Sequence, residues 1–328
     1  VATDLVMVLS RGEVFLDSIF FSLNIGEEVE DSPQKPDKYG YICLDDTDTN
    51  WEIAPGFNWI EISLQVDDRD FDGILLEELT GDSPFDVGDV TAIPLPFQFR
   101  FYGQTYDTIS VTTNGFICPG NQNVTNPQNW PLDRAMGGGA GMIAPFWDWL
   151  MMDNQSGVYY FYNSDEHYLV VEWYRFKQYP EGETDLTFQV IIYHPQAYLN
   201  ESGDSNILMQ YSSIENGEGF FIIEDNIAFA SVGISSPDGL SGINYTFGGE
   251  YPITSAPLDN RRAIKFTTSM WEEFQEPPRL GSIYGMARDA GTDAPIRGVT
   301  IELSSGQDTQ TGGDGFFCFA EIPADDIF

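Results

Sequence analysis

Residues 157–193, GVYYFYNSDEHYLVVEWYRFKQYPEGETDLTFQVIIY, hold three apolar and aromatic runs in succession. The runs lie at 157–162, 168–176 and 186–193, and polar turn residues separate them. They are rich in Val, Ile, Phe, Tyr and Trp, which favour strands. None of them shows a sustained 3.6-residue period, which argues against amphipathic helices. This stretch therefore predicts consecutive β-strands.

The same pattern extends in both directions along the chain. Similar runs occur at 96–102, 109–114, 207–212, 228–235, 242–247 and 262–267. Strand signals at roughly 8–12-residue spacing, with turn formers such as Asn114-Gly115 between them, are typical of a β-sandwich. We predict an all-β protein of tandem β-sandwich domains. A jelly-roll-like central domain would occupy 39–270 and an Ig- or transthyretin-like domain would follow it.

The flanking segments predict further domains. Two apolar runs around Arg11-Gly12 indicate that 1–28 are the terminal strands of an upstream Ig-like domain. Two charged, proline-bearing segments, 29–38 and 271–278, are predicted linkers. Residues 279–328 form a partial third domain with short strands at 281–287, 299–303 and 316–319.

Both ends of the sequence fall inside strand-like patterns. The chain starts at Val1 rather than at a methionine, and it stops at Phe328. We therefore expect a larger polypeptide, with any signal or anchor outside these residues.

The charge of the chain excludes several partners. A net charge of −38, from 52 acidic and 14 basic residues, repels nucleic-acid phosphates and anionic lipid head groups. No stretch approaches the roughly 20 apolar residues that a membrane helix needs. We therefore expect no nucleic-acid partner and no direct membrane insertion. Solubility outside the cell is the simplest interpretation of the charge, and it favours a secreted or cell-surface location.

Three cysteines, Cys43, Cys118 and Cys318, lie far apart in the sequence. The absence of a CxxC motif argues against a zinc ribbon, and so few cysteines cannot form a disulfide-dense scaffold. One pair could form a disulfide, or all three could be buried thiols. The sequence leaves this choice open.

Residues 279–328 resemble a carboxypeptidase regulatory-like domain, a small transthyretin-like β-sandwich. The motifs that carry the resemblance are Gly281-Ser-Ile-Tyr-Gly285, Thr292-Asp-Ala-Pro295-Ile296-Arg-Gly298-Val299, and Thr311-Gly-Gly-Asp314-Gly315-Phe316. The resemblance implies a non-catalytic spacer in an exported protein, cut short before the fold is complete.

Residues 39–268 are similar to a β-sandwich found in exported bacterial proteins, including gingipain-type secreted peptidases. The similar stretches are Leu95-Pro-Phe-Gln-Phe-Arg-Phe101-Tyr102-Gly103, Ile109-Ser-Val-Thr-Thr-Asn114-Gly115-Phe116, Ile143-Ala-Pro145-Phe146-Trp147-Asp148 and Thr187-Phe188-Gln189-Val190. The resemblance implies an accessory module of bacterial origin, and nothing in the chain corresponds to the peptidase's Cys–His domain.

No catalytic signature accompanies the nucleophiles of the chain. Covalent catalysis needs a base beside its nucleophile, and the only histidines are His167 and His194. Cys118 and His194 could in principle meet, but no local motif supports that pair. We predict that this chain is not an enzyme.

Trp147-Asp148-Trp149 is a candidate carbohydrate contact, because aromatic platforms beside an acid bind sugars. The alternative is that Trp147 anchors the core while Asp148 caps a turn. The polar, glycine-rich segment 119–141 is a second candidate contact, because loops of this length are often functional.

Two acidic turns are candidate calcium sites. Asp68, Asp70 and Asp72, followed by a glycine, have the D-x-D-x-D-G spacing of a calcium loop. Leu79 occupies the position of the usual bidentate acid, so a regular EF-hand is not expected. The second cluster consists of Asp45, Asp46 and Asp48. Solvated turns are the alternative for both.

These features favour a non-catalytic structural or adhesive role, such as spacing, display, or assembly into a surface layer or fibre. An accessory region of a gingipain-type peptidase and a carbohydrate-binding module are the alternatives. The expected partners are other domains of the same polypeptide, further copies of the chain, or surface glycans. Calcium is the one cofactor that the sequence suggests.

Overall fold

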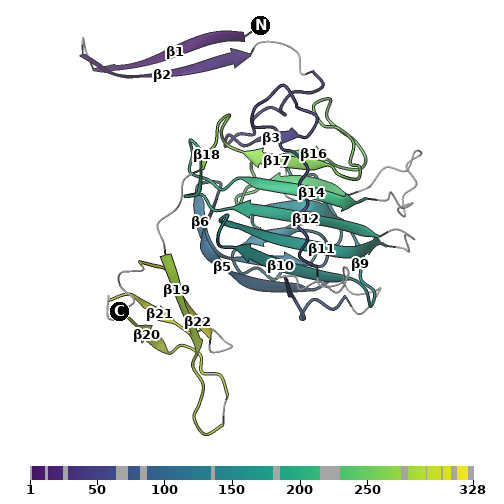
Figure 1. Cartoon of the computed structure of the whole chain (residues 1–328), viewed down its shortest axis with the longest axis vertical. Helices are drawn as coiled ribbons and strands as arrows, with labels where there is room; N and C mark the ends of the chain where they lie inside the picture. The colour runs from purple at the N-terminus through teal and green to yellow at the C-terminus, as the bar shows by residue number, and fades with distance from the viewer. Residues whose placement is uncertain are drawn as a thin grey trace.

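The computed structural model describes residues 2–11, 14–24, 29–63, 73–81, 87–133, 137–179, 185–214, 230–274, 280–292, 294–303, 306–311 and 316–323. Within these ranges every helix or strand is a β-strand, which confirms the predicted all-β class (Figure 1). No helix in them is long and apolar enough to cross a membrane.

An eight-stranded antiparallel sheet forms one layer of the central region. Its strands follow the order β3-β17-β14-β12-β11-β10-β4, and β9 pairs with the end of β11. The strands are β3 (Ile42–Asp45), β4 (Ile74–Leu75), β9 (Leu150–Met151), β10 (Gly157–Asn163), β11 (Tyr168–Gln178), β12 (Leu186–Tyr193), β14 (Ile207–Ser213) and β17 (Ala263–Thr267).

A six-stranded sheet forms the second layer, in the order β16-β15-β8-β7-β6-β5. The strands are β5 (Val90–Phe101), β6 (Gln104–Thr112), β7 (Ile117–Pro119), β8 (Met142–Trp147), β15 (Ser231–Ser235) and β16 (Gly242–Thr246). Each of the nine strand runs named above overlaps a strand, although residues 228–229 of one run lie outside the described part. The short strands β7 and β8 were not predicted.

One hydrophobic core lies between the two sheets. Phe97, Ile109 and Phe146 from the six-stranded sheet join Trp173 and Phe188 from the eight-stranded sheet in this core. Alternate residues of each strand point inward, which is the period-2 pattern of a sandwich.

Two buried side chains also hydrogen-bond across the layers. The Trp173 indole donates to the Thr112 carbonyl at 2.7 Å, and the Tyr211 hydroxyl donates to the Pro145 carbonyl at 2.6 Å. The predicted β-sandwich is thus confirmed.

The outer face of each sheet carries a smaller hydrophobic cluster under a long loop. Residues 53–63, here called the strap, cross the outer face of the eight-stranded sheet, where Phe57, Ile60 and Ile62 pack on it. The segment 119–141, whose residues 134–136 are outside the described part, covers the six-stranded sheet through Val124 and Leu132. The described part of 119–141 is therefore held against the sheet by hydrophobic packing.

The remaining strands form two-stranded pairs. The pairs are β1 (Ala2–Arg11) with β2 (Val14–Asn24), β13 (Tyr198–Leu199) with β18 (Glu273–Phe274), β19 (Leu280–Met286) with β22 (Phe316–Pro323), and β20 (Thr300–Glu302) with β21 (Asp308–Gln310). Figure 1 shows the β1–β2 hairpin apart from the central sheets. These strands agree with the expected hairpin and C-terminal strands, whereas the domains assigned to them stay predictions.

Candidate functional site

Amide side chains tie the strap to the eight-stranded sheet. The Gln210 amide on β14 accepts a hydrogen bond from the Asn58 N–H at 2.6 Å and donates to the Asn58 carbonyl at 2.9 Å. On β12, Gln189 in its satisfied orientation donates to the Ile60 carbonyl at 3.0 Å and accepts from the Ile60 N–H at 3.2 Å. Amide side chains thus make the hydrogen bonds to the strap backbone that a neighbouring strand would make in a sheet.

Glu172 on β11 continues this row, because it lies opposite Gln189 in the sheet register. Its side chain is fully buried under the strap. Neither carboxyl oxygen makes a hydrogen bond of good geometry in the described chain, although the Ile62 backbone and the Ser63 side chain lie close enough to favour its charged form. Burial raises the pKa of Glu172 well above its usual value, and the negative charge of Glu61 raises it further. The third position of the row is therefore a carboxyl whose charged form is disfavoured by burial.

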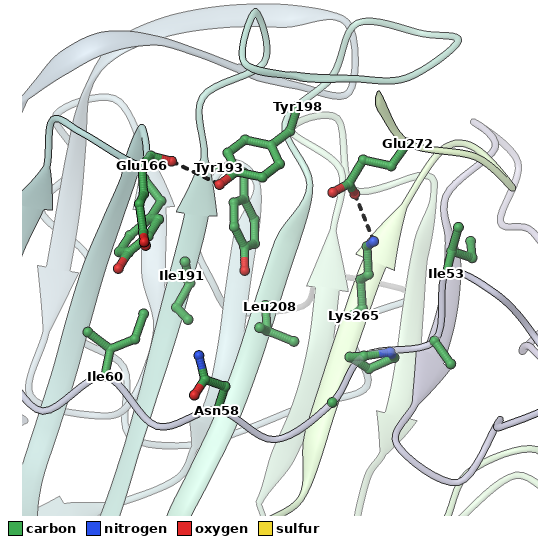
Figure 2. A pocket seen from close by; sticks show the side chains of 14 residues that line it. Ile53, Asn58, Ile60, Glu166, Ile191, Tyr193, Tyr198, Leu208, Lys265 and Glu272 are labelled. Carbon is green, nitrogen blue, oxygen red and sulfur yellow. Dashed lines mark hydrogen bonds and ion pairs between the residues drawn. The ribbon is translucent and has the colours of Figure 1, made fainter. Parts of the chain in front are cut away.

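A groove of about 280 Å³ lies between the strap and the β13–β18 pair (Figure 2). Its floor is formed by side chains from β11, β12, β14 and β17, and its walls by the strap and by residues next to β13 and β18. The lining residues are Ile53, Ala54, Pro55, Gly56, Asn58, Ile60, Glu166, Tyr168, Ile191, Tyr193, Tyr198, Leu208, Lys265 and Glu272.

Three tyrosines line one side of the groove. The rings of Tyr168 and Tyr193 are 6.1 Å apart, and those of Tyr193 and Tyr198 are 4.6 Å apart. The Tyr198 hydroxyl donates to the Glu166 carbonyl at 2.9 Å, and burial raises the pKa of Tyr198 to about 12. Figure 2 shows the Tyr193 hydroxyl pointing between Ile191 and Leu208. The tyrosines thus offer both ring surface and a polar atom to the groove.

An ion pair closes the other side of the groove. The Lys265 ammonium lies 2.7 Å from the Glu272 carboxylate, which also accepts a hydrogen bond from the Asn206 amide. Both side chains of the pair are mostly buried, at 13% and 26% exposure. The groove therefore presents fixed donors and acceptors, and the charges of Lys265 and Glu272 balance each other within the pair.

Two exposed aromatic residues, here called the aromatic rim, lie next to the groove. Phe274 is 53% exposed and its ring packs on Tyr198 at 5.3 Å. Trp271 is 44% exposed, and its indole donates to the Glu201 carboxylate at 3.1 Å. Groove and aromatic rim together form a surface with the aromatic enrichment of binding sites.

Trp147, predicted as a sugar contact, is part of the core instead. It is fully buried, packs edge-on against Phe116 at 5.6 Å, and donates its indole N–H to the Asn126 carbonyl at 2.8 Å. A ligand ring has no access to it. The prediction was wrong for Trp147 because the segment 119–141 covers this face of the sheet.

Asp148 and Trp149 lie beside Trp147 but outside the groove. The Asp148 carboxylate accepts from Gln178 at 2.7 Å and from the Trp149 N–H at 2.8 Å, and burial raises its pKa to about 6. Trp149 stacks on Tyr179 with ring centres 4.0 Å apart. Asp148 thus fixes a turn, and Trp149 remains a partly exposed aromatic.

The histidines and Cys118 belong to different parts of the sandwich. Cys118 lies in the cluster under segment 119–141, where burial raises its thiol pKa to about 12. His194 follows β12 and packs on Phe97 at 4.8 Å. Burial, and then the charge of His167, lower the pKa of His194 to about 4. A buried neutral thiol on the other sheet is a poor nucleophile for this histidine. Cys43 and Cys118 are free thiols.

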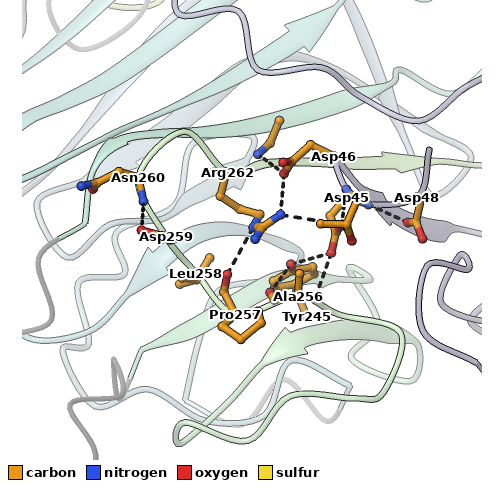
Figure 3. Close-up of polar contacts among 12 residues, drawn as sticks. Asp45, Asp46, Asp48, Tyr245, Ala256, Pro257, Leu258, Asp259, Asn260 and Arg262 are labelled. Carbon is orange, nitrogen blue, oxygen red and sulfur yellow. Dashed lines mark hydrogen bonds and ion pairs between the residues drawn. The ribbon is translucent and has the colours of Figure 1, made fainter.

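The acidic turn at the end of β3 is organised around Arg262 (Figure 3). The Arg262 guanidinium lies 2.8 Å from Asp46 and 3.9 Å from Asp45. Asp45 also accepts hydrogen bonds from Thr47 and from the Tyr245 hydroxyl. Burial would raise the Asp45 pKa, but these hydrogen bonds hold it below its usual value. The positive charge of Arg262 thus already lies beside the two carboxylates that were predicted to bind calcium.

Asp48 turns one oxygen toward the Asp45 N–H at 2.8 Å, and burial raises its pKa to about 6. In the described ranges, no three His, Cys, Asp or Glu side chains are grouped to hold a metal. The other predicted cluster, Asp68, Asp70 and Asp72, lies outside the described residues. Calcium binding stays a prediction.

We expect calcium to raise the melting temperature of the chain by a few degrees. Ligand at ten times its Kd adds about 1.4 kcal/mol of stability, and extracellular sites commonly bind calcium with Kd of about 0.1–1 mM. Thermal melts with calcium and with chelator test this, with a variant that carries alanine at Asp68, Asp70 and Asp72. If the variant responds as the unmodified chain does, the loop is only a solvated turn.

A family model described as NIDO related matches residues 73–265, more than half of the chain. The match spans β4 to β17 and so includes the groove floor, but not the strap. Domains of this type occur in extracellular proteins. No curated protein and no solved structure matches the chain. The comparisons give no support to the gingipain-type or carboxypeptidase regulatory-like resemblances.

Proposed function

Since this chain belongs to the NIDO-related family, we propose that it is a non-catalytic adhesive module of a secreted or cell-surface protein. The observation that supports this role is the groove with its aromatic rim. Exposed aromatic side chains next to fixed polar groups are typical of surfaces that bind a partner. By contrast, apolar side chains of the strap and of segment 119–141 are packed against the sheets that these segments cover.

The geometry of the candidate nucleophiles supports a non-catalytic role. Cys118 and His194 lie on different sheets and pack into different clusters. Glu172 and Asp148 have the raised pKa values of general acids, but Glu172 is sealed under the strap and Asp148 is held by Gln178. Neither carboxyl lines the groove, where a substrate would bind.

The adhesive role can be measured with beads coated with the full chain. We expect such beads to attach to surfaces that carry either the chain itself or neutral glycans, and not to albumin. Truncating the aromatic rim with Trp271→Ala and Phe274→Ala removes exposed contact area and should reduce attachment. Leu240→Ala, at a residue 65% exposed outside the groove, is the matched control. Attachment no better than to albumin on every surface would overturn the proposal.

A further inference from the structure

We propose that the groove between the strap and the β13–β18 pair binds a ring of a neutral sugar. This inference rests on the proposed adhesive function and names its ligand class. Tyrosine rings, an open amide and a balanced ion pair converge there, within a space of about 280 Å³. Pockets for drug-sized ligands usually enclose about 300–1,000 Å³, so this volume suits one sugar ring.

The apolar face of a pyranose packs on aromatic side chains, and the groove provides such a surface. Tyr193 and Tyr198 are partly exposed and their rings lie 4.6 Å apart. Ile191 and Leu208 fill the floor beneath them, as Figure 2 shows. Tyr198 cannot turn freely, because its hydroxyl is bound to the Glu166 carbonyl and Phe274 packs on its ring. A ring surface fixed in advance loses little entropy on binding.

The hydroxyl groups of a sugar need donors and acceptors, and two groups of the groove remain open for them. No hydrogen bond joins a described group to the Tyr193 hydroxyl, which Figure 2 shows between Ile191 and Leu208 at the floor of the groove that Tyr193 lines. Asn58 has both of its backbone groups bound by Gln210, while its exposed side-chain amide lines the groove. Because Gln210 holds the Asn58 backbone, the point at which this side chain leaves the strap is fixed.

The charges around the groove select against ions of either sign. The net charge of −38, together with Glu166 and Glu272 at the groove, disfavours sulfated or sialylated glycans. A cationic peptide side chain would meet Lys265, which already occupies the Glu272 carboxylate at 2.7 Å. A neutral polyol avoids both costs.

The test is binding of the labelled full chain to an array of neutral, sialylated and sulfated glycans and lysine-rich peptides. We expect binding to neutral glycans. Tyr193→Phe keeps the ring and removes only the open hydroxyl, so affinity should fall about two- to tenfold. Tyr198→Ala should weaken binding about tenfold or more. Tyr179→Ala, which removes the aromatic partner of Trp149 outside the groove, should leave affinity unchanged.

Each other outcome overturns the inference. Preference for anionic glycans or for lysine-rich peptides would show that charge, not the polyol, is recognised. The inference is also overturned if no glycan binds, or if the Tyr193 and Tyr198 variants bind as tightly as the unmodified chain. Loss of affinity in Tyr179→Ala alone would move the site to Trp149. If the chain adheres to further copies of itself, beads would still attach to the immobilised chain when sugar binding fails. Failure of the sugar proposal can therefore be distinguished from failure of the adhesive function.

Discussion

Trp147→Ala is expected to lower the free energy of unfolding by about 3–5 kcal/mol, the usual cost of removing a large aromatic side chain from a core. Trp147 is fully buried against Phe116, and its indole N–H satisfies the Asn126 carbonyl. The substitution leaves a cavity and frees that carbonyl of its donor. It also removes the residue on which segment 119–141 rests. Chemical denaturation followed by tryptophan fluorescence measures the change.

Trp149→Ala provides the matched control, since Trp149 is the same residue type two positions further on. Its ring is partly exposed and stacks only on Tyr179. Loss of one such aromatic contact costs about 0.5–1.5 kcal/mol beyond the area it buries. Equal losses for the two variants would contradict the different roles that the structure gives them. A Trp147→Ala protein with unchanged stability would show that the segment does not depend on this anchor.

The strands of the sandwich could be predicted because their pattern is local. The runs at 157–162, 168–176 and 186–193 each become a strand, β10, β11 and β12, with small differences at the ends. Alternation between core and outer face is visible in a single strand, as with Val170 and Val171. The short strands β7 and β8 were missed because three and six residues next to a long loop give a weak signal.

The groove could not be predicted, because it depends on segments far apart in the sequence. Tyr168, Tyr193 and Tyr198 fit ordinary strand patterns, and only the fold brings them beside Asn58 and Glu272. For the same reason Trp147 and Trp149 could not be distinguished. Both are tryptophans beside an acid, and only the covering segment decides which is buried. One weaker signal for the groove was available in the sequence. The strap sequence IAPGFNWIEIS is more apolar than an ordinary exposed loop, which indicates that it packs on another surface.

Glu172→Gln is expected to stabilise the chain by about 1–3 kcal/mol at about pH 8, the typical cost of a buried polar group without partners. Glu172 stands in a row with Gln189 and Gln210, both of which hold the strap through their amides. A glutamine of the same shape can donate to the strap as well as accept from it. It also removes the negative charge that Glu172 would carry when ionised at high pH, which repels Glu61. The substitution therefore completes the row of amides.

The pH dependence follows from the direction of the shift. The folded pKa of Glu172 is raised above its unfolded value of about 4.3, so the folded chain holds this proton more tightly. The stability that the neutral carboxyl contributes is complete below about pH 4.3. It is lost as the pH rises toward the folded pKa, at up to about 1.4 kcal/mol per pH unit.

Urea denaturation of the variant and the unmodified chain at about pH 4 and about pH 8 separates the contribution of Glu172 to stability from that of the other acids. The two proteins should be nearly equal at the lower pH and diverge at the higher one. Glu166→Gln, at an exposed acid near the same groove, should show no divergence. If Glu172→Gln destabilises equally at both pH values, the carboxyl has partners that the amide cannot replace. In that case the carboxyl would hold the strap through hydrogen bonds whose strength does not change between the two pH values.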